Sequence, residues 1–240
     1  MKTKKISTLA SGDLNTIVGI GTGGVLQSSS DLNNIYDNLF IMYHQKSNDF
    51  PVMVKLNKWP ALQTSGEVAD GVVVVEGGRH LVISPTQPAT LPWSSAAIAG
   101  GGFTTTDRVA AINDLAGKAN TAAQIAASGG GGAITNTAAY APGYCNLYSI
   151  VNVNNKGLTA GKWWLPSLGE LMMIYANMRK INYALNLIAG SNPLIESAYW
   201  SSTERSATLA WYLALSNGAM STLTKATYSR YVRPVSAFIS

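Results

Sequence analysis

The chain of 240 residues has little charge and a single cysteine. Asp, Glu, Lys and Arg together make up 12% of it, about half the share of roughly 25% found in an average soluble domain. The lone cysteine, Cys145, excludes a disulfide within the chain and any zinc or redox site that is built from cysteines. So sparse a charge favours subunit contacts, or a virion or extracellular setting, over the cytosol.

Metal ligands and nucleic-acid contacts are also scarce. His44 and His80 lie far apart, and neither has a partner at a spacing typical of metal ligands. The net charge is +5, and three of the positive charges are Lys2, Lys4 and Lys5, a pattern typical of a solvated tail. No later cluster of basic and aromatic residues follows, so we expect no nucleic-acid partner, no metal and no cofactor.

Long apolar runs are missing as well. No stretch approaches the roughly 18 apolar residues that a membrane span requires, so we expect no membrane insertion. The amino terminus is basic enough to begin a signal peptide, but Ser, Gly, Asp and Asn interrupt the apolar segment that should follow. We therefore expect no cleavable export signal.

Residues 1–50 are predicted to form a small β-rich segment for attachment or oligomerisation. A short β-prone run leads through a glycine turn to a second strand over residues 25–27, and a brief helix, capped by Ser30 or Asp31, ends near Phe40. The remaining residues, 51–240, are predicted to form one ligand-binding domain.

Three glycines in the first segment, Gly19, Gly21 and Gly24, satisfy the G-x-G-x-x-G pattern of dinucleotide binding. The pattern requires a buried strand before it and a helix directly after it, but the residues that follow predict a strand or a loop. A glycine-rich hairpin turn is therefore favoured over a nucleotide site.

The middle of the chain alternates between strands, loops and one helical region. Alternating apolar residues predict a strand over 51–56, and the run "DGVVVVEGGRHLVIS" predicts two strands joined by a turn at Gly77 and Gly78. Residues 106–128 are predicted to be helical in at least their second half, and the glycines at 129–132 to end that helix in a mobile loop.

A longer helix is predicted from Leu168. Ser167 stands three residues before Glu170, which is the spacing of a capping box, and apolar side chains follow at helical intervals. A second apolar set continues toward Gly190, which has the position of a C-terminal stop. The Met and Tyr side chains on this helix are predicted to fill a core rather than to hold a cofactor.

Beyond Pro193 the apolar period changes from about 3.6 residues to 2, which is typical of strands. The face predicted to point into the core carries Leu209, Trp211, Leu213 and Leu215. The face predicted to point outward carries Ala210, Tyr212 and Ala214. A turn at 216–218 leads to a second strand that ends at Thr224, and a last strand places Val232 inward before Pro234.

The chain contains four segments in the order "GKWWLPSLGEL", "YWSSTE", "AWYLALSNG" and "YVRPVSAF". Together they resemble the C-type lectin-like fold of the formylglycine-generating-enzyme and Legionella collagen-like C-terminal type. More narrowly, the chain is similar to the variable proteins of diversity-generating retroelements, a group that includes phage tropism determinants. The resemblance covers about residues 66–240. It implies an α+β domain with two helices and a twisted antiparallel sheet, whose carboxyl-terminal strands and loops bind a ligand.

In that group, asparagine codons of a template are randomised at adenines, which can give Ser, Thr, Ala, Arg, Tyr or Leu but not Trp, Met, Lys or Glu. Trp211, Met220 and Lys225 are therefore excluded from the variable set. The side chains implied to hold the sheet are Trp200, Trp211, Leu213, Leu215 and Val232. The diversified, ligand-binding positions implied for this chain are Arg205, Ser206, Thr208, Tyr212, Ala214, Ser221, Thr222, Thr224, Ala226, Thr227, Ser229 and Arg230. The open alternative is that Ser, Thr and Ala simply fill exposed strands and turns.

The sequence lacks residues on which related groups of proteins depend, and this limits the functions that we expect. The calcium-binding tripeptides of sugar-binding lectins are missing, so calcium-dependent sugar recognition is not expected. Formylglycine-generating oxidases rely on a cysteine pair, whereas the apolar neighbours of Cys145 predict a buried, inert thiol. Neither histidine has a visible nucleophile partner and no carboxylate pair stands out, so we expect no catalytic residues. Tyr231 stands where the family often carries arginine, and it fits either the framework or the binding surface.

The first 35 or so residues also resemble the attachment segments at the start of phage tail-fibre proteins. We therefore expect a non-catalytic receptor-binding protein on the virion, a homo-oligomer and in particular a trimer, that binds a protein or glycan receptor on the bacterial surface. Two alternatives stay open. One is a bacterial cell-surface adhesin of the same fold, and the other is a formylglycine-generating-type oxidase.

Overall fold

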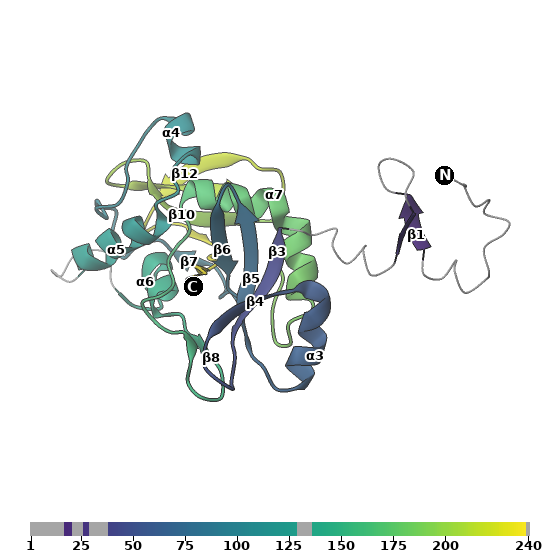
Figure 1. Cartoon of the computed structure of the whole chain (residues 1–240). Helices are drawn as coiled ribbons and strands as arrows, with labels where there is room; N and C mark the ends of the chain where they lie inside the picture. The colour runs from purple at the N-terminus through teal and green to yellow at the C-terminus, as the bar shows by residue number, and fades with distance from the viewer. Residues whose placement is uncertain (1–16, 21–25, 29–37, 129–135, 239–240) are drawn as a thin grey trace.

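The computed structural model describes residues 17–20, 26–28, 38–128 and 136–238 (Figure 1). Within these ranges the chain is an α+β protein with antiparallel sheets and few helices, as the sequence predicts. The helix expected before Phe40 and the loop expected at 129–132 lie largely or wholly outside the described residues. Among the described helices, none has both the length and the hydropathy of a transmembrane segment.

The strands and helices divide the chain as follows. The strands are β1 (Ile17–Ile20), β2 (Leu26–Ser28), β3 (Leu39–His44), β4 (Pro51–Lys55), β5 (Ala69–Glu76), β6 (Arg79–Ile83), β7 (Leu91–Pro92), β8 (Ile150–Val151), β9 (Gly157–Leu158), β10 (Ala198–Glu204), β11 (Leu209–Ala214), β12 (Met220–Thr224), β13 (Ser229–Arg230) and β14 (Val235–Ala237). The helices are the 3-10 turn η2 (Leu56–Lys58) and the α-helices α3 (Trp59–Thr64), α4 (Arg108–Ile112), α5 (Gly117–Ser128), α6 (Ala141–Leu147) and α7 (Leu168–Leu185).

The largest sheet has five strands in the order β14-β6-β5-β3-β4. Gly77 and Gly78 join β5 to β6, and their φ angles of 56° and 76° give the predicted hairpin turn. β3 pairs with β4, so the division predicted at residue 50 falls between the two strands of one hairpin. Phe40, where a helix was expected to end, instead lies inside β3, because this segment pairs with the valine-rich β5 as well as with β4.

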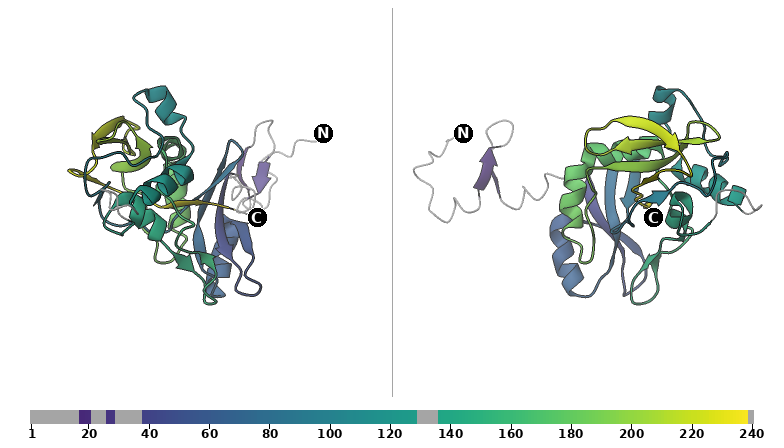
Figure 2. Two further views of the ribbon diagram at one scale, coloured as in Figure 1. Left: turned by 90° about the vertical axis from the view of Figure 1, so that its left-hand side faces the viewer. Right: turned by 180° about the vertical axis from the view of Figure 1, so that it is seen from behind.

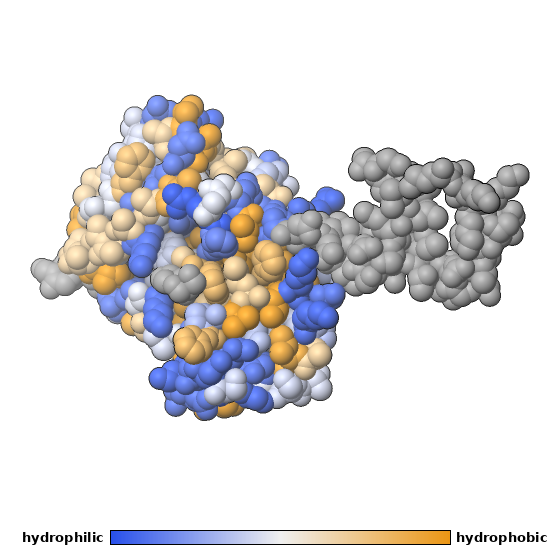
Figure 3. Space-filling view, in the orientation of Figure 1, coloured by the Kyte–Doolittle hydropathy of each residue, from blue (hydrophilic) through white to orange (hydrophobic). Residues whose placement is uncertain are grey.

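Helix α7 covers one face of this sheet and lies between it and a second sheet of three strands (Figure 2). Alternate side chains of β3, β5 and β6 point toward α7 and form the main core. The intervening side chains, such as Met42 and Val73, pack with Leu158 and Trp163 on the opposite face. Half-buried side chains around Met42 and Trp163 on this opposite face contribute to the apolar area over the sheet in Figure 3.

Helix α7 begins at Leu168 with the predicted capping box. The Ser167 hydroxyl accepts the Glu170 backbone N–H, and the Glu170 carboxylate accepts the Ser167 backbone N–H. The helix ends at Leu185, five residues before the stop that Gly190 predicted. The end comes early because tight turns follow and because the Ser191 hydroxyl donates to the Leu185 carbonyl at 2.6 Å.

The three-stranded sheet, in the order β10-β11-β12, confirms most of the predicted alternation. Trp211, Leu213 and Leu215 are at most 3% exposed and pack against α7 in the main core. Tyr212 and Ala214, on the other face of β11, are half-buried. The core side of the carboxyl-terminal ribbon therefore lies where the sequence predicted it.

Three predictions about this sheet need correction. Leu209 was expected to point into the core, but at the start of β11 it is half-buried and lies outside the main core. Ala210 was expected to face outward, but it is buried in a second cluster with Trp93, Trp200 and Val232. Trp200 was expected to share the core with Trp211, but it pairs directly with Tyr212 across β10 and β11, so its ring lies on the opposite face. The outer face of the ribbon is therefore covered at one end and open at the other.

The predicted last strand is divided in two. β13 pairs with β7, whereas β14 pairs with β6 in the five-stranded sheet. Val232 is buried between them, as predicted. Pro234 has no backbone N–H to donate and its carbonyl accepts the Ser84 N–H, so the chain passes from one sheet to the other at this point.

β1 and β2 pair with each other as an antiparallel hairpin. Gly19 lies in β1, and the next described element is the strand β2 rather than a helix. Gly21 and Gly24, the glycines of the predicted turn, lie outside the described residues.

The carboxyl group of Glu170 makes the stability of the fold dependent on pH. It is buried, and burial raises its pKa from 4.5 to about 7, although the Ser167 N–H and the Trp164 indole N–H both donate to it. The folded state thus binds the proton more tightly than the unfolded chain. We predict that the unfolding free energy falls as pH rises from about 4.5 to about 7, by on the order of 1–3 kcal/mol.

Denaturant titrations across this pH range test the prediction with Glu170→Gln, which cannot ionise. The variant should lose the downward slope between pH 4.5 and 7. Glu196→Gln, at an exposed carboxylate, is the control and should keep it. An identical slope in wild type and Glu170→Gln would contradict the assignment.

Candidate functional site

All twelve predicted binding residues are exposed or half-buried, and none is part of the core. They follow the chain as Arg205, Ser206 and Thr208 on the β10–β11 turn, Tyr212 and Ala214 on β11, Ser221, Thr222 and Thr224 on β12, and Ala226, Thr227, Ser229 and Arg230 between β12 and the end of β13. Two of the residues that the coding argument excluded, Trp211 and Lys225, are buried. The third, Met220, is half-buried and packs against the main core.

The strand register divides the twelve residues between two faces. Ser221 lies opposite Tyr212, so both belong to the outer face of the ribbon. Thr222 lies opposite Trp211 and Thr224 opposite Leu209, so these two threonines share the face that is turned toward α7. They are accessible because β12 is the edge strand of its sheet. Thr222 and Thr224 are therefore not part of the same surface as Tyr212.

Four of the predicted residues come together around one shallow hollow of about 430 Å³. They are Tyr212, Ala214, Ser229 and Arg230. The remaining lining residues are Thr90, Glu196, Ser197, Ala198, Ser216 and Tyr231. Tyr231, which the sequence left open, thus belongs to the wall of the hollow. Thr90 and Glu196 were missed, because they come from segments before β7 and β10 that carry no pattern of their own.

Arg230 is held in this hollow by aromatic rings. Its guanidinium carbon lies 5.3 Å from the centre of the Tyr212 ring and 5.9 Å from that of Tyr228. Tyr212 in turn meets Trp200 edge to face, with 6.3 Å between ring centres. One terminal nitrogen of Arg230 donates to the Ser229 carbonyl at 2.8 Å. The side chain is therefore positioned before any ligand arrives.

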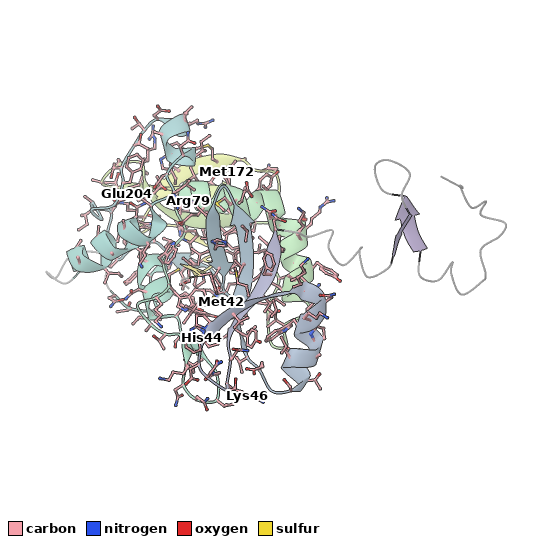
Figure 4. The ribbon with its side chains drawn as sticks, in the orientation of Figure 1. Met42, His44, Lys46, Arg79, Met172 and Glu204 are labelled. Atoms are coloured by element: carbon pink, nitrogen blue, oxygen red, sulfur yellow. The ribbon has the colours of Figure 1, made fainter. Side chains whose placement is uncertain are left out.

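The β10–β11 turn is fixed by a buried ion pair, Glu204 with Lys225, in which both side chains are 0% exposed (Glu204 is labelled in Figure 4). The Lys225 ammonium also donates to the carbonyls of Ile98 and Ala207 at 2.9 and 2.8 Å, and it lies 4.5 Å from the centre of the Trp93 ring. Burial lowers the pKa of Lys225, and Glu204 opposes that shift.

Glu204 uses its remaining lone pairs on a neighbouring loop. It accepts the backbone N–H groups of Gly100 and Gly102 at 2.8 and 2.9 Å. The ion pair therefore ties together the β10–β11 turn, the end of β12 and the loop at 98–102. The sequence excluded Lys225 from the variable set but did not predict this pairing, because the two residues are 21 positions apart.

A second buried cation, Arg233, fixes the segment that leads into β10. It donates to the side-chain oxygen and the backbone carbonyl of Asn192 at 2.7 and 2.8 Å. Burial lowers its pKa to about 10, and the nearby Tyr199, Tyr148 and Tyr144 oppose that shift. Buried polar contacts thus fix both the β10–β11 turn and the segment that leads into β10.

One histidine has a partner that the sequence did not reveal. His44 Nδ1 lies 2.6 Å from Asp70 Oδ2, and burial raises the pKa of that carboxyl group (His44 is labelled in Figure 4). In the described ranges, no hydroxyl or thiol hydrogen-bonds to the His44 ring, and no three His, Cys, Asp or Glu residues are placed to hold a metal ion. Cys145 is fully buried, as predicted, and burial raises the pKa of its thiol.

Comparison with known proteins adds little to this geometry. No family model matches the chain, and no curated protein matches it. Among solved structures, the chain is similar to a fimbrial protein from Bacteroides ovatus, with 20% identity and a TM-score of 0.46 over 66% of this chain. The chain spans 36% of the length of that protein. A likeness this distant assigns neither a family nor a function.

We predict that Lys225→Met lowers the unfolding free energy by about 3–5 kcal/mol, because it leaves the Glu204 carboxylate buried without its cation. Adding Glu204→Gln removes that charge, so the double variant should lose less stability than the two single variants together. Lys118→Met, at an exposed lysine, should change stability by less than about 0.5 kcal/mol. Chemical denaturation of the four variants measures these values. Additive losses at Glu204 and Lys225 would show that the pair is not coupled.

Proposed function

We propose that the chain is a non-catalytic receptor-binding protein that presents the outer face of its carboxyl-terminal ribbon to a ligand on a bacterial surface. One observation carries the proposal. Tyr212, Ala214, Ser229 and Arg230 line a single hollow, while the strand that holds Tyr212 and Ala214 is fixed by Trp211 and Leu213 on its opposite face and by the buried Ala210 on the same face. A surface built in this manner can change its side chains without loss of the fold beneath it.

Within this proposal, the domain is a C-type lectin-like scaffold whose binding residues are diversified by a retroelement. The support is the division between variable and constant positions. Each of the twelve candidate positions is exposed or half-buried, whereas Trp211 and Lys225, which the coding argument forbids, are buried where a change would be costly. Ser206 also has a structural role, because its hydroxyl accepts the backbone N–H groups of Thr208 and Leu209 in its own turn.

The proposal includes two settings for the same binding surface, the tail of a phage and the surface of a bacterial cell. The similar solved structure is named a fimbrial protein, and that name indicates the bacterial surface as the setting of the Bacteroides ovatus protein. In either setting, several copies on one particle would raise the avidity of a weak site. Mass spectrometry of purified virions and of bacterial surface fractions separates the two.

Tyr212→Ala should weaken binding of the purified protein to receptor-bearing cells while lowering the unfolding free energy by at most about 1–2 kcal/mol, because its ring is half-buried. Trp211→Ala, on the opposite face, should cost roughly 3–5 kcal/mol. Flow cytometry and chemical denaturation measure the two effects.

Tyr183→Ala is the matched control, since Tyr183 is an exposed tyrosine on α7 that does not line the hollow. It should leave both cell binding and stability unchanged. Equal losses of stability in the Trp211 and Tyr212 variants, or full cell binding by Tyr212→Ala, would overturn the proposal.

Diversification predicts a pattern in the genome. An adenine-rich near-copy of the segment that encodes residues 205–230 should lie close to the gene, together with a reverse-transcriptase gene. The near-copy should differ from the gene at the codons of the accessible positions and agree with it at Trp211 and Lys225. Sequencing of the locus checks this, and the absence of both elements would remove the retroelement while leaving the binding surface in place.

A further inference from the structure

The hollow is lined by hydroxyl groups that have no hydrogen-bond partner among the described residues. Six of its lining residues carry a hydroxyl, namely Thr90, Ser197, Tyr212, Ser216, Ser229 and Tyr231. None of these six hydroxyls hydrogen-bonds to another residue in the described part of the chain. By contrast, the buried hydroxyl of Thr203 donates to Asp114 Oδ2 at 2.7 Å. The free hydroxyls therefore form a polar surface that is available to a ligand.

The hollow also contains a cation without an acidic partner. In the described ranges, the ion pairs are His44 with Asp70 and Lys225 with Glu204, and Arg230 takes part in neither. The Nε atom of Arg230 is shielded from solvent and has no hydrogen-bond partner there. The rings of Tyr212 and Tyr228 restrict the side chain, so less conformational entropy is lost when it binds. A guanidinium held in this way is suited to a planar, bidentate anion.

We propose that the hollow binds a saccharide that carries a carboxylate, such as a uronic or sialic acid residue. Arg230 pairs with the carboxylate, the free hydroxyls bond to those of the sugar, and the Tyr212 ring packs against the apolar face of the sugar ring. The volume of about 430 Å³ falls within the range of roughly 300–1,000 Å³ that is typical of ligand sites. The inference rests on the proposed function and gives its receptor a chemical class.

The carboxylate of Glu196 makes the hollow selective for an acidic sugar over other anions. It is exposed and lines the same hollow, so a doubly charged phosphate would meet a negative charge as well as Arg230. A sugar carboxylate carries a single charge, and the hydroxyls around it can donate to Glu196. A simple carboxylate such as acetate would leave both Glu196 and the six hydroxyls without partners. The lining as a whole therefore favours an acidic sugar over a small anion.

The test uses the full chain and an array that pairs uronic and sialic acid glycans with neutral counterparts. We expect binding to carboxylated glycans and loss of binding when the carboxylate is converted to its methyl ester. For the best glycan, Arg230→Gln should raise the Kd about tenfold or more, whereas Arg108→Gln, at an exposed arginine outside the hollow, should leave it unchanged. Thermal unfolding of each variant confirms that the fold is kept.

Failure of this inference is distinct from failure of the proposed function. If cells bind and Tyr212→Ala abolishes that binding, but no carboxylated glycan on the array is retained, the receptor class is wrong and the binding surface stands. Equal affinity for acid and methyl ester, or an unchanged Kd in Arg230→Gln, would also overturn the acidic-sugar assignment. Loss of glycan binding in Arg230→Gln with no effect of either variant on cells would overturn the proposed function instead.

Discussion

The ion pair between Glu204 and Lys225 is the interaction on which the carboxyl-terminal ribbon depends. Removing two charges from water is costly, and here the cost is offset by a full set of partners: two glycine N–H groups for the carboxylate, two carbonyls for the ammonium and the face of Trp93. These contacts join the β10–β11 turn, the end of β12 and the loop at 98–102. The backbone of these segments is thereby fixed without help from the exposed side chains.

Other buried polar groups of the interior are held by hydrogen bonds to neutral partners rather than by ion pairs. With 12% charged residues, the chain relies on buried amides and hydroxyls, such as Asn192 beneath Arg233 and Gln124, which donates to the Ser202 carbonyl at 2.7 Å. Such contacts depend on geometry and stay in place over a wide range of salt concentration. A rigid framework of this kind is what a changeable surface requires, because binding residues on a stable backbone add no folding cost when they vary.

The position of the hollow follows from how far the second core cluster extends. Trp93, Trp200 and Val232 cover the outer face of the ribbon at Ala210, and Tyr212 packs against the edge of this cluster, whereas Ala214 lies beyond it. Where this cover ends, the side chains of β11 are half-exposed, and the segments before β7 and β10 supply a wall. The hollow thus lies where the cover of the outer face ends, whereas Trp211 and Leu213 on the other face of β11 are buried in the main core.

Local patterns in the sequence determined the start of α7, the hairpin at Gly77 and Gly78, and which side of β11 holds Trp211 and Leu213, because capping, glycine turns and alternation depend on near neighbours. They did not reveal β10, which is buried on both faces and so has no alternation. Only the tertiary structure decided that Ala210 is covered, that Thr222 and Thr224 face away from Tyr212, and that Glu204 meets Lys225. These outcomes depend on strand order and register between distant segments, and sequence spacing alone does not specify either.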